Sequence, residues 1–258
     1  MVLIIGILYH YDIISKVMKN HFDKNNKYFD EPHSPKILDD MKNQKPHAFL
    51  GLASESYLFQ MQMIKKLKIN SILEVGPGEG FCAINLSRAG YDYETLDYKA
   101  LDVYGFKLTY EQSLLDFDSE NHPKKYDLTC AFQVLEHFEY DKFKANIKKL
   151  SDISKKYVFI SLPYSCIGFS FNLRLQISQI LSLNKKIQFY IPSFKNNRKY
   201  REEYIKNYPF AIHYWEIGRK NFPLRKIIND LESLNLSIVK KIHGPNPFHY
   251  FILCEKKS

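Results

Sequence analysis

The sequence predicts an α/β fold in which helices cover a mostly parallel sheet. Short apolar runs typical of strands alternate with segments whose apolar residues recur every three or four positions. Such alternation is typical of parallel strands joined by crossover helices. The C-terminal end differs, because the turn between its last two expected strands holds only a few residues. A connection that short requires an antiparallel pair.

The first expected helix begins near Ser54 and carries an apolar stripe at three-residue steps: Leu58, Met61, Ile64 and Leu67. Six later runs have strand or helix character before the chain reaches a long insertion. We expect strands over residues 71–75, 93–97, 126–132 and 157–162, and helices over residues 82–89 and 140–150. After the insertion, we expect a helix opening at residues 221–223, then strands over residues 236–242 and 248–254.

The composition is that of a soluble globular protein of one large domain. The chain has 258 residues, of which 45% are hydrophobic and 25% charged, which excludes disordered and fibrous classes. No run of about eighteen apolar residues is present, and residues 1–8 lack the features of a secretion signal. The four cysteines are widely spaced, which favours a reducing compartment. We therefore expect a cytoplasmic protein with no membrane partner.

The net charge of +9 is concentrated in one part of the chain. Lysines outnumber arginines by 31 to 6, a skew typical of AT-rich genomes, so the total charge is weak support for nucleic-acid binding. Residues 163–223, however, hold ten basic and three acidic residues, a net +7. The sequence predicts a basic lid over residues 165–220 that either attracts a phosphate-bearing acceptor or is only a solvated surface.

A glycine-rich turn follows the first expected strand: Glu74-Val-Gly-Pro-Gly-Glu-Gly80. Glycines at alternate positions let the backbone turn sharply and let a ligand approach closely. A dinucleotide-binding fingerprint would place its third glycine at position 81, which is Phe81, so this pattern disfavours an NAD site.

This turn resembles motif I of the class I S-adenosylmethionine-dependent methyltransferases. Three further features occur in the family's order: Asp97 at the end of the second strand, the segment 126–138 ending in Val-Leu-Glu-His-Phe, and the closing helix with its antiparallel pair. The Val-Leu-Glu-His-Phe ending is typical of the small-molecule branch. The resemblance covers residues 54–164 and 221–256.

The resemblance implies a Rossmann-like seven-stranded sheet, mostly parallel with an antiparallel last strand, with helices on both faces and a lid insertion. Residues 1–258 would form a single methyltransferase domain. Within it, residues 1–70 would be a helical extension, residues 71–164 and 221–258 the cofactor-binding core, and residues 165–220 the basic lid.

The resemblance also implies S-adenosyl-L-methionine as cofactor and S-adenosyl-L-homocysteine as product. Glu74 would meet the methionine end of the cofactor, and Asp97 would hold the ribose hydroxyls. Relatives often place an aspartate near the adenine where this chain has Ser113, so that contact departs from the family's pattern. The remaining implied cofactor-binding residues are Gly76, Pro77, Gly78, Tyr98, Leu114 and Gln133.

Two histidines are candidate bases for the acceptor's proton. His137 follows the fourth expected strand and His213 lies at the end of the insertion; either could instead have a structural role. Beside His213, Tyr214 and Trp215 could stack on a sugar or base, and Glu216 could position a hydroxyl. The alternative for these three is packing of the lid. The nine histidines are scattered without ligand spacing, so no metal site is expected.

These features together favour methyl transfer to a small acceptor that carries a sugar or phosphate group. Oxygen is the expected acceptor atom, because no Asn/Asp-Pro-Pro-Tyr/Phe motif of amino-methylating enzymes follows the fourth strand. Resemblance alone suggests a role in surface polysaccharide synthesis. Two alternatives stay open: an RNA methyltransferase that docks RNA on the basic insertion, and a non-catalytic protein with the methyltransferase fold. The sequence does not predict the oligomeric state.

Overall fold

The structure is a computed structural model that describes residues 48–78, 80–99, 107–176, 182–197, 199–200 and 212–257. Its contacts divide the chain into two units, Met1–His47 with Arg201–Ile212, and Ala48–Tyr200 with His213–Ser258. Every helix and strand named below belongs to the second unit. Residues 1–47 of the predicted helical extension lie outside the described residues, so that part of the domain division stays a prediction.

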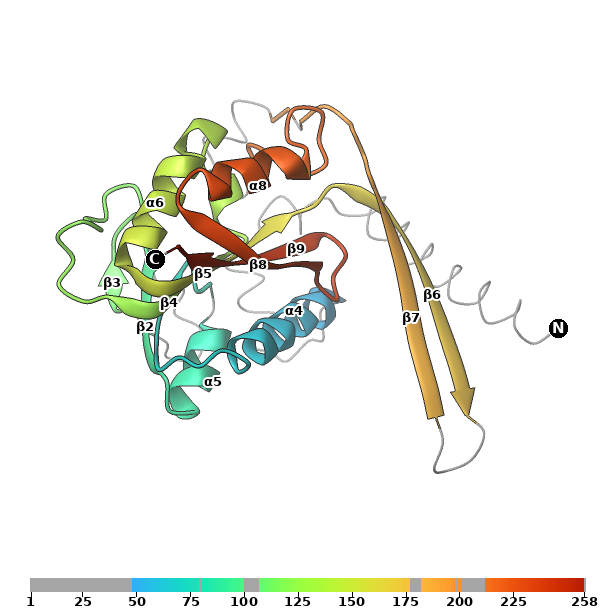
Figure 1. Cartoon of the computed structure of the whole chain (residues 1–258), viewed down its shortest axis with the longest axis horizontal. Helices are drawn as coiled ribbons and strands as arrows, with labels where there is room; N and C mark the ends of the chain where they lie inside the picture. Colours follow the sequence, from blue (N-terminus) through green and yellow to red (C-terminus); the bar gives the residue numbers. More distant parts are fainter. Residues whose placement is uncertain are drawn as a thin grey trace. The chain divides into compact units, whose positions relative to one another are not determined.

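The second unit is built on a seven-stranded sheet with the order β3-β2-β1-β4-β5-β9-β8 (Figure 1). Its strands are β1 (Ser71–Val75), β2 (Asp92–Asp97), β3 (Tyr110–Glu111), β4 (Tyr126–Phe132), β5 (Ser154–Pro163), β8 (Leu236–His243) and β9 (His249–Lys256). The pairs among β1 to β5 are parallel, and β9 runs antiparallel to both β5 and β8. The predicted mostly parallel sheet with an antiparallel last strand is therefore confirmed.

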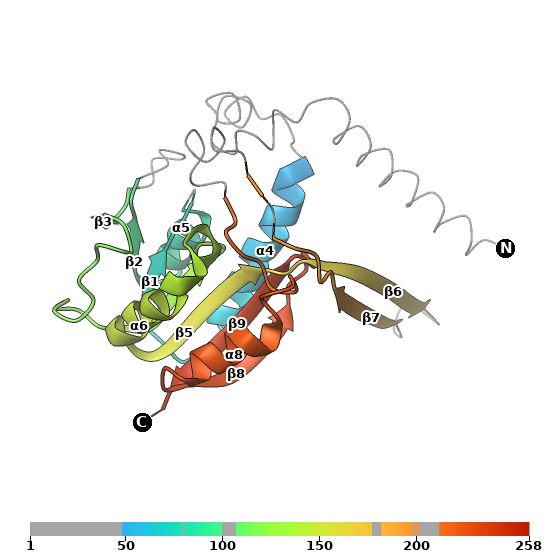
Figure 2. The same ribbon diagram turned by 90° about the horizontal axis from the view of Figure 1, so that it is seen from above.

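Helices cover both faces of this sheet, as the two views in Figures 1 and 2 show. One face carries α4 (Ala48–Ile64) and α5 (Phe81–Arg88), and the other carries α6 (Phe143–Ile153) and α8 (Leu224–Glu232). Two short 3-10 turns, η1 (Leu135–His137) and η2 (Tyr140–Lys142), connect β4 to α6. Right-handed crossovers from parallel strands place helices on both faces in this way.

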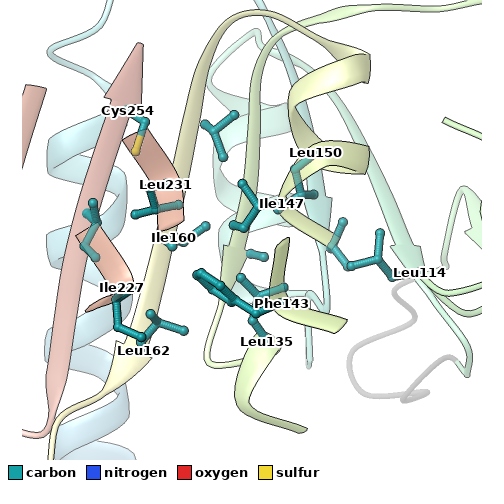
Figure 3. Close-up of a cluster of buried hydrophobic side chains, with 14 of the residues drawn as sticks. Leu114, Leu135, Phe143, Ile147, Leu150, Ile160, Leu162, Ile227, Leu231 and Cys254 are labelled. Carbon is teal, nitrogen blue, oxygen red and sulfur yellow. The ribbon is translucent and has the colours of Figure 1, made fainter. Parts of the chain in front are cut away.

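The core between α6, α8 and the sheet is formed by the apolar stripes that the sequence predicts. Phe143, Ile147 and Leu150 of α6 are fully buried against β5, and Ile227 and Leu231 of α8 join the same cluster (Figure 3). Burial of side chains of this size contributes about 1.5 to 3 kcal/mol each. This layer supports β4, whose carboxyl end borders the candidate site.

The predicted stripe on α4 is partly wrong. Leu58 is 51% exposed, whereas Gln60, Met63 and Ile64 are buried. Ser56, Gln60 and Met63, which follow one another at steps of four and three residues, form the buried face of the helix. Leu58 lies outside this face. The buried amide of Gln60 accepts a hydrogen bond from the Cys82 thiol on α5 at 3.2 Å, which makes a polar residue acceptable there.

The insertion contains a second sheet that the sequence analysis did not predict. Strands β6 (Cys166–Gln176) and β7 (Ser182–Pro192) pair as an antiparallel hairpin. Three directly opposed pairs expose large apolar side chains: Ile167 with Ile191, Phe169 with Phe189, and Phe171 with Ile187. At its base, the Ser165 amide donates to the Ile217 carbonyl at 2.8 Å, and Tyr190 stacks on His243 of β8. The use of this insertion as a lid stays a prediction.

None of the described helices is long and apolar enough to span a lipid bilayer.

Candidate active site

The candidate site lies at the carboxyl ends of β1 and β4. From β1 the chain proceeds outward through β2 to β3, and on the other side it proceeds from β4 to β5. The order therefore reverses between β1 and β4. Open α/β sheets bind ligands at the carboxyl ends of their strands at such a switch point.

The glycine loop after β1 has a backbone that other residues would not readily adopt. Gly76, Gly78 and Gly80 have φ of 70°, 55° and 75°. A Cβ at Gly76 would lie 2.3 Å from Cγ2 of Val134, in the turn after β4, so the two loops are in close contact. A Cβ at Gly78 would meet nothing within 4 Å. The loop therefore presents open backbone, and the Pro77 carbonyl closes its turn by accepting from the Gly80 amide at 2.9 Å.

Glu74 lies beneath this loop, and its side chain is only 3% exposed. The hydroxyl of Tyr93 donates a hydrogen bond to its Oε2 at 2.9 Å. Burial raises the pKa of Glu74 to about 7, although the bond from Tyr93 acts in the opposite direction. A buried carboxyl group with one neutral partner can respond strongly to a nearby cation such as the amino group of a bound methionine moiety.

Asp97 ends β2 on the other side of the glycine loop. Its Oδ1 accepts a hydrogen bond from the Tyr98 amide at 2.7 Å, and burial raises its pKa while the amides of Tyr98 and Lys99 lower it. The Tyr98 side chain is 47% exposed. Farther along, the Ser113 hydroxyl accepts from the Leu115 amide at 3.1 Å, and Leu114 is buried in the core.

Gln133 closes the site at the end of β4. It has φ of 57°, and its amide and side-chain nitrogen donate to the carbonyl and hydroxyl of Ser161 at 3.0 and 3.1 Å. The left-handed backbone redirects the chain into η1. An accessible glycine loop, an acidic residue one strand away and the position at the switch point fit the cofactor that the resemblance implies.

Next to this half of the site, the structure gathers Glu136, His137 and His213. Glu136 is fully buried, and neither of its carboxylate oxygens has a hydrogen-bond partner among the described residues. The rings of His137 and His213 lie edge to face with centroids 5.1 Å apart. One donor atom from each of the three residues lies within 4.8 Å of the other two. Burial raises the pKa of Glu136 to about 7, which the charge of His213 partly offsets.

The segment that carries His213 is bound to the turn after β4 by backbone and indole contacts. The Tyr214 amide donates to the Glu136 carbonyl at 2.9 Å, and the Trp215 indole donates to the Phe138 carbonyl at 3.0 Å. The Trp215 side chain is fully buried and packs edge to face on Tyr140. The prediction that Trp215 stacks on an acceptor therefore needs correction: Trp215 anchors the segment, and the partly exposed Tyr214 is the aromatic side chain available to a ligand.

A buried ion pair orients His213. Oε1 of Glu216 lies 3.3 Å from Nδ1 of His213, and Oε2 of Glu216 accepts from Nε of Arg219 at 2.8 Å. The terminal nitrogen of Arg219 lies 2.6 Å from the same oxygen, and both Glu216 and Arg219 are buried. Glu216 is thus a positioning group for His213.

Sequence reasoning missed two residues of this cluster, Glu136 and Arg219. Glu136 is not among the site residues that the sequence predicts, and Arg219 contributes there only to the charge of the insertion. The three-residue spacing from His213 to Glu216 to Arg219 was a readable signal. The expectation of no metal site stays a prediction, although the fold brings two of the scattered histidines close to one carboxylate.

Comparison with known proteins is consistent with this architecture. A family model described as "Methyltransferase domain" matches residues 34–240. The chain is similar to magnesium protoporphyrin IX methyltransferase from Synechocystis PCC 6803, solved with bound S-adenosylhomocysteine, with 12% identity and a TM-score of 0.50 over 89% of this chain and 97% of that chain. It is also similar to a putative O-methyltransferase from Nostoc punctiforme PCC 73102, with 11% identity and a TM-score of 0.50 over 81% and 58% of the respective chains. At these identities the likeness shows the fold alone. No curated protein sequence matched the chain.

Proposed function

The chain belongs to the methyltransferase domain family, and on that premise we propose that it transfers a methyl group from S-adenosylmethionine to a hydroxyl oxygen of a small acceptor. The observation that carries this proposal is the contact between the two halves of the site. Gly76 of the glycine loop packs against Val134, and Val134 leads within three residues to Glu136 and His137. A donor bound at the glycine loop would therefore face the polar cluster at short range.

The cofactor's two ends are assigned to different strands. Asp97 would accept hydrogen bonds from the ribose hydroxyls, and the open backbone at Gly78 would allow the ligand to approach. Tyr98, Ser113 and Leu114 would border the adenine, while Glu74 and Gln133 would border the methionine portion. When bound, S-adenosylmethionine would supply an electrophilic methyl group on a positively charged sulfur; the acceptor oxygen would bond to the methyl carbon as the carbon–sulfur bond breaks, which leaves S-adenosylhomocysteine.

The acceptor hydroxyl must lose a proton as its oxygen attacks. His137 and His213 are the candidate proton acceptors, because neutral imidazole accepts a proton near physiological pH. Glu216, held by Arg219, accepts the Nδ1 proton of His213, which leaves the other ring nitrogen to act on the acceptor.

The acceptor itself is proposed to be a sugar or a phosphorylated metabolite of cytoplasmic surface-polysaccharide synthesis. The net +7 of residues 163–223 supports an acidic acceptor, and the partly exposed Tyr214 offers a ring on which a sugar can pack. The same charge would attract RNA, which is the alternative acceptor.

The proposal is tested by measuring S-adenosylhomocysteine release with three acceptor pools: nucleotide-linked sugars, sugar phosphates and total RNA. We expect turnover with one of the first two pools, and a loss of at least tenfold in the His213→Asn variant but not in His122→Asn. His122 packs against Tyr110 and Phe117, away from the cluster, which makes it the matched control. Turnover only with RNA, with binding that weakens steeply as salt rises, would replace the small acceptor by RNA. Absence of turnover with every pool and with a cell extract would favour the non-catalytic alternative.

A further inference from the structure

We propose that Glu136, His137 and His213 bind one divalent first-row transition-metal ion, with zinc as the representative ion. One donor atom of each residue lies within 4.8 Å of the other two. Ligand atoms that share an ion at about 2.1 Å lie on the order of 3.5 Å apart in a tetrahedral site, so the donors need to move inward by only about 1 Å. Side-chain rotation can provide such a shift without a change of the backbone.

The carboxylate of Glu136 is the observation that points to a cation. This side chain is fully buried, and neither of its oxygens has a hydrogen-bond partner among the described residues. A buried carboxyl group without partners costs several kcal/mol in its charged form. A bound cation would compensate the buried carboxylate. If this position in η1 were purely structural, leucine or glutamine could be buried there at a lower cost in free energy.

The donor set is typical of a transition-metal site with open positions. Two imidazoles and one carboxylate provide three protein ligands, and imidazole prefers zinc, iron, cobalt and nickel over magnesium or calcium. Three protein ligands leave room for a water molecule or an acceptor oxygen, as in catalytic zinc sites. Neutral histidines and one carboxylate cancel only half of the ion's charge, so the site would favour a further anionic ligand.

The partners of His213 support the same conclusion. A metal-bound histidine commonly donates the N–H of its other ring nitrogen to a carboxylate, which fixes the ring and its tautomer. Glu216 stands 3.3 Å from Nδ1 of His213, and Arg219 holds that carboxylate in place. With Nδ1 engaged by Glu216, Nε2 is the nitrogen of His213 that remains for an ion.

The role of the ion rests on the proposed function, although its binding does not. An acceptor hydroxyl bound at an open position would become more acidic, as water does on zinc. Its O–H bond would break with the electron pair remaining on oxygen, and the proton would pass to solvent water. The two histidines would then hold the ion instead of accepting the proton themselves.

The test is a titration of the chelator-treated full-length protein with Zn²⁺ by calorimetry and with Co²⁺ by visible absorption, without cofactor or acceptor. We expect one ion per chain, and we expect Glu136→Gln and His213→Asn to weaken binding by about 100-fold or more, beyond the roughly 10- to 100-fold loss typical when a residue that only orients a ligand is changed. His122→Asn is the matched control and should bind as the parent chain does. Circular dichroism and thermal melting establish that each variant is folded.

Stoichiometric binding that is unchanged in both cluster variants, or no binding to the parent chain, would overturn the metal site. S-adenosylhomocysteine affinity is measured in parallel on the same samples. Cofactor binding without metal binding would leave the proposed methyl transfer intact and return the histidines to the role of bases. Metal binding without cofactor binding would keep the site and contradict the proposed function.

Discussion

The imidazole rings of His137 and His213 lie with centroids 5.1 Å apart, although one residue follows β4 and the other lies near the end of the insertion. Their proximity depends on the hydrogen bond from the Tyr214 amide to the Glu136 carbonyl and on the burial of Trp215. This end of the insertion is thereby fixed to the end of β4. In the proposed function, the acceptor would bind at this contact and the cofactor would bind at the glycine loop beside it.

The first prediction separates two glycines of that loop. Gly76→Ala would place a methyl group 2.3 Å from Val134 as well as in a left-handed backbone, so we expect a loss of stability of about 3 kcal/mol or more. Gly78→Ala meets nothing within 4 Å and should cost only the backbone strain of about 1 to 2 kcal/mol. Chemical denaturation measures both changes.

Gly78→Ala should nevertheless weaken S-adenosylhomocysteine binding by tenfold or more, because the added methyl group would occupy the space through which the cofactor approaches. Gly90→Ala, another left-handed glycine with open space around it, is the control and should bind normally. Unchanged affinity in Gly78→Ala would remove the loop from the cofactor site.

The second prediction concerns the buried carboxyl group of Glu74. Its pKa in the folded protein is raised to about 7 from an ordinary value of 4.5, so the folded state holds the proton more tightly than the unfolded state. The contribution of this group to stability should therefore be greatest below about pH 4.5 and fall as pH rises to 7, by on the order of 2 to 3 kcal/mol. Glu74→Gln, which can still accept from Tyr93, should remove this fall.

Urea denaturation of the parent chain and of Glu74→Gln between pH 5 and 8 checks the sign. The difference in stability should grow in favour of the variant as pH rises. A constant difference across this range would show that Glu74 is ionised throughout.

The third prediction distinguishes an anchor from an acceptor contact. Trp215→Ala should destabilise the protein by about 3 to 5 kcal/mol, because it leaves a large buried cavity and an unpartnered Phe138 carbonyl. Tyr214→Ala, at a partly exposed position beside it, should cost less than about 1 kcal/mol and raise KM for the acceptor instead. Thermal melting combined with steady-state kinetics separates the two outcomes. If Trp215→Ala is as stable as the parent chain, Trp215 is not an anchor.

The fourth prediction uses the two ends of β2. Asp97→Ala should weaken cofactor binding by an order of magnitude or more, because the carboxylate at the carboxyl end of the strand is assigned to the ribose hydroxyls. Asp92→Ala, at the opposite end of the same strand, removes a salt bridge to Lys124 and should leave the affinity unchanged. Calorimetry with S-adenosylhomocysteine measures both. Equal affinity of Asp97→Ala and the parent chain would exclude Asp97 from the site.

Much of the sheet could be predicted because its elements carry local signals. The alternation of apolar runs predicted β1, β2, β4 and β5 but not the two-residue strand β3, and the short turn before His249 predicted the antiparallel end. The motif after β1 predicted the family, which the match over residues 34–240 confirms. These features depend on residues that are close together in the sequence, so they can be predicted from the sequence alone.

The features that could not be predicted depend on contacts between distant residues. The rotation of α4 depends on Gln60 meeting the Cys82 thiol, and the pattern of apolar residues alone favoured Leu58. The burial of Trp215 depends on its hydrogen bond to Phe138 and its packing on Tyr140. The cluster of Glu136 with two histidines arises in the same way, because tertiary contacts bring His213 to the end of β4.

The central claim is that the chain binds S-adenosylmethionine at the switch point between β1 and β4 and uses it as methyl donor. Its most direct test is calorimetric titration of the purified protein with S-adenosylmethionine and with S-adenosylhomocysteine. We expect one molecule of either compound to bind per chain at micromolar concentrations. In Asp97→Ala, we expect the affinity for both compounds to be lower by an order of magnitude or more. No binding of either compound at high micromolar concentration would contradict the claim.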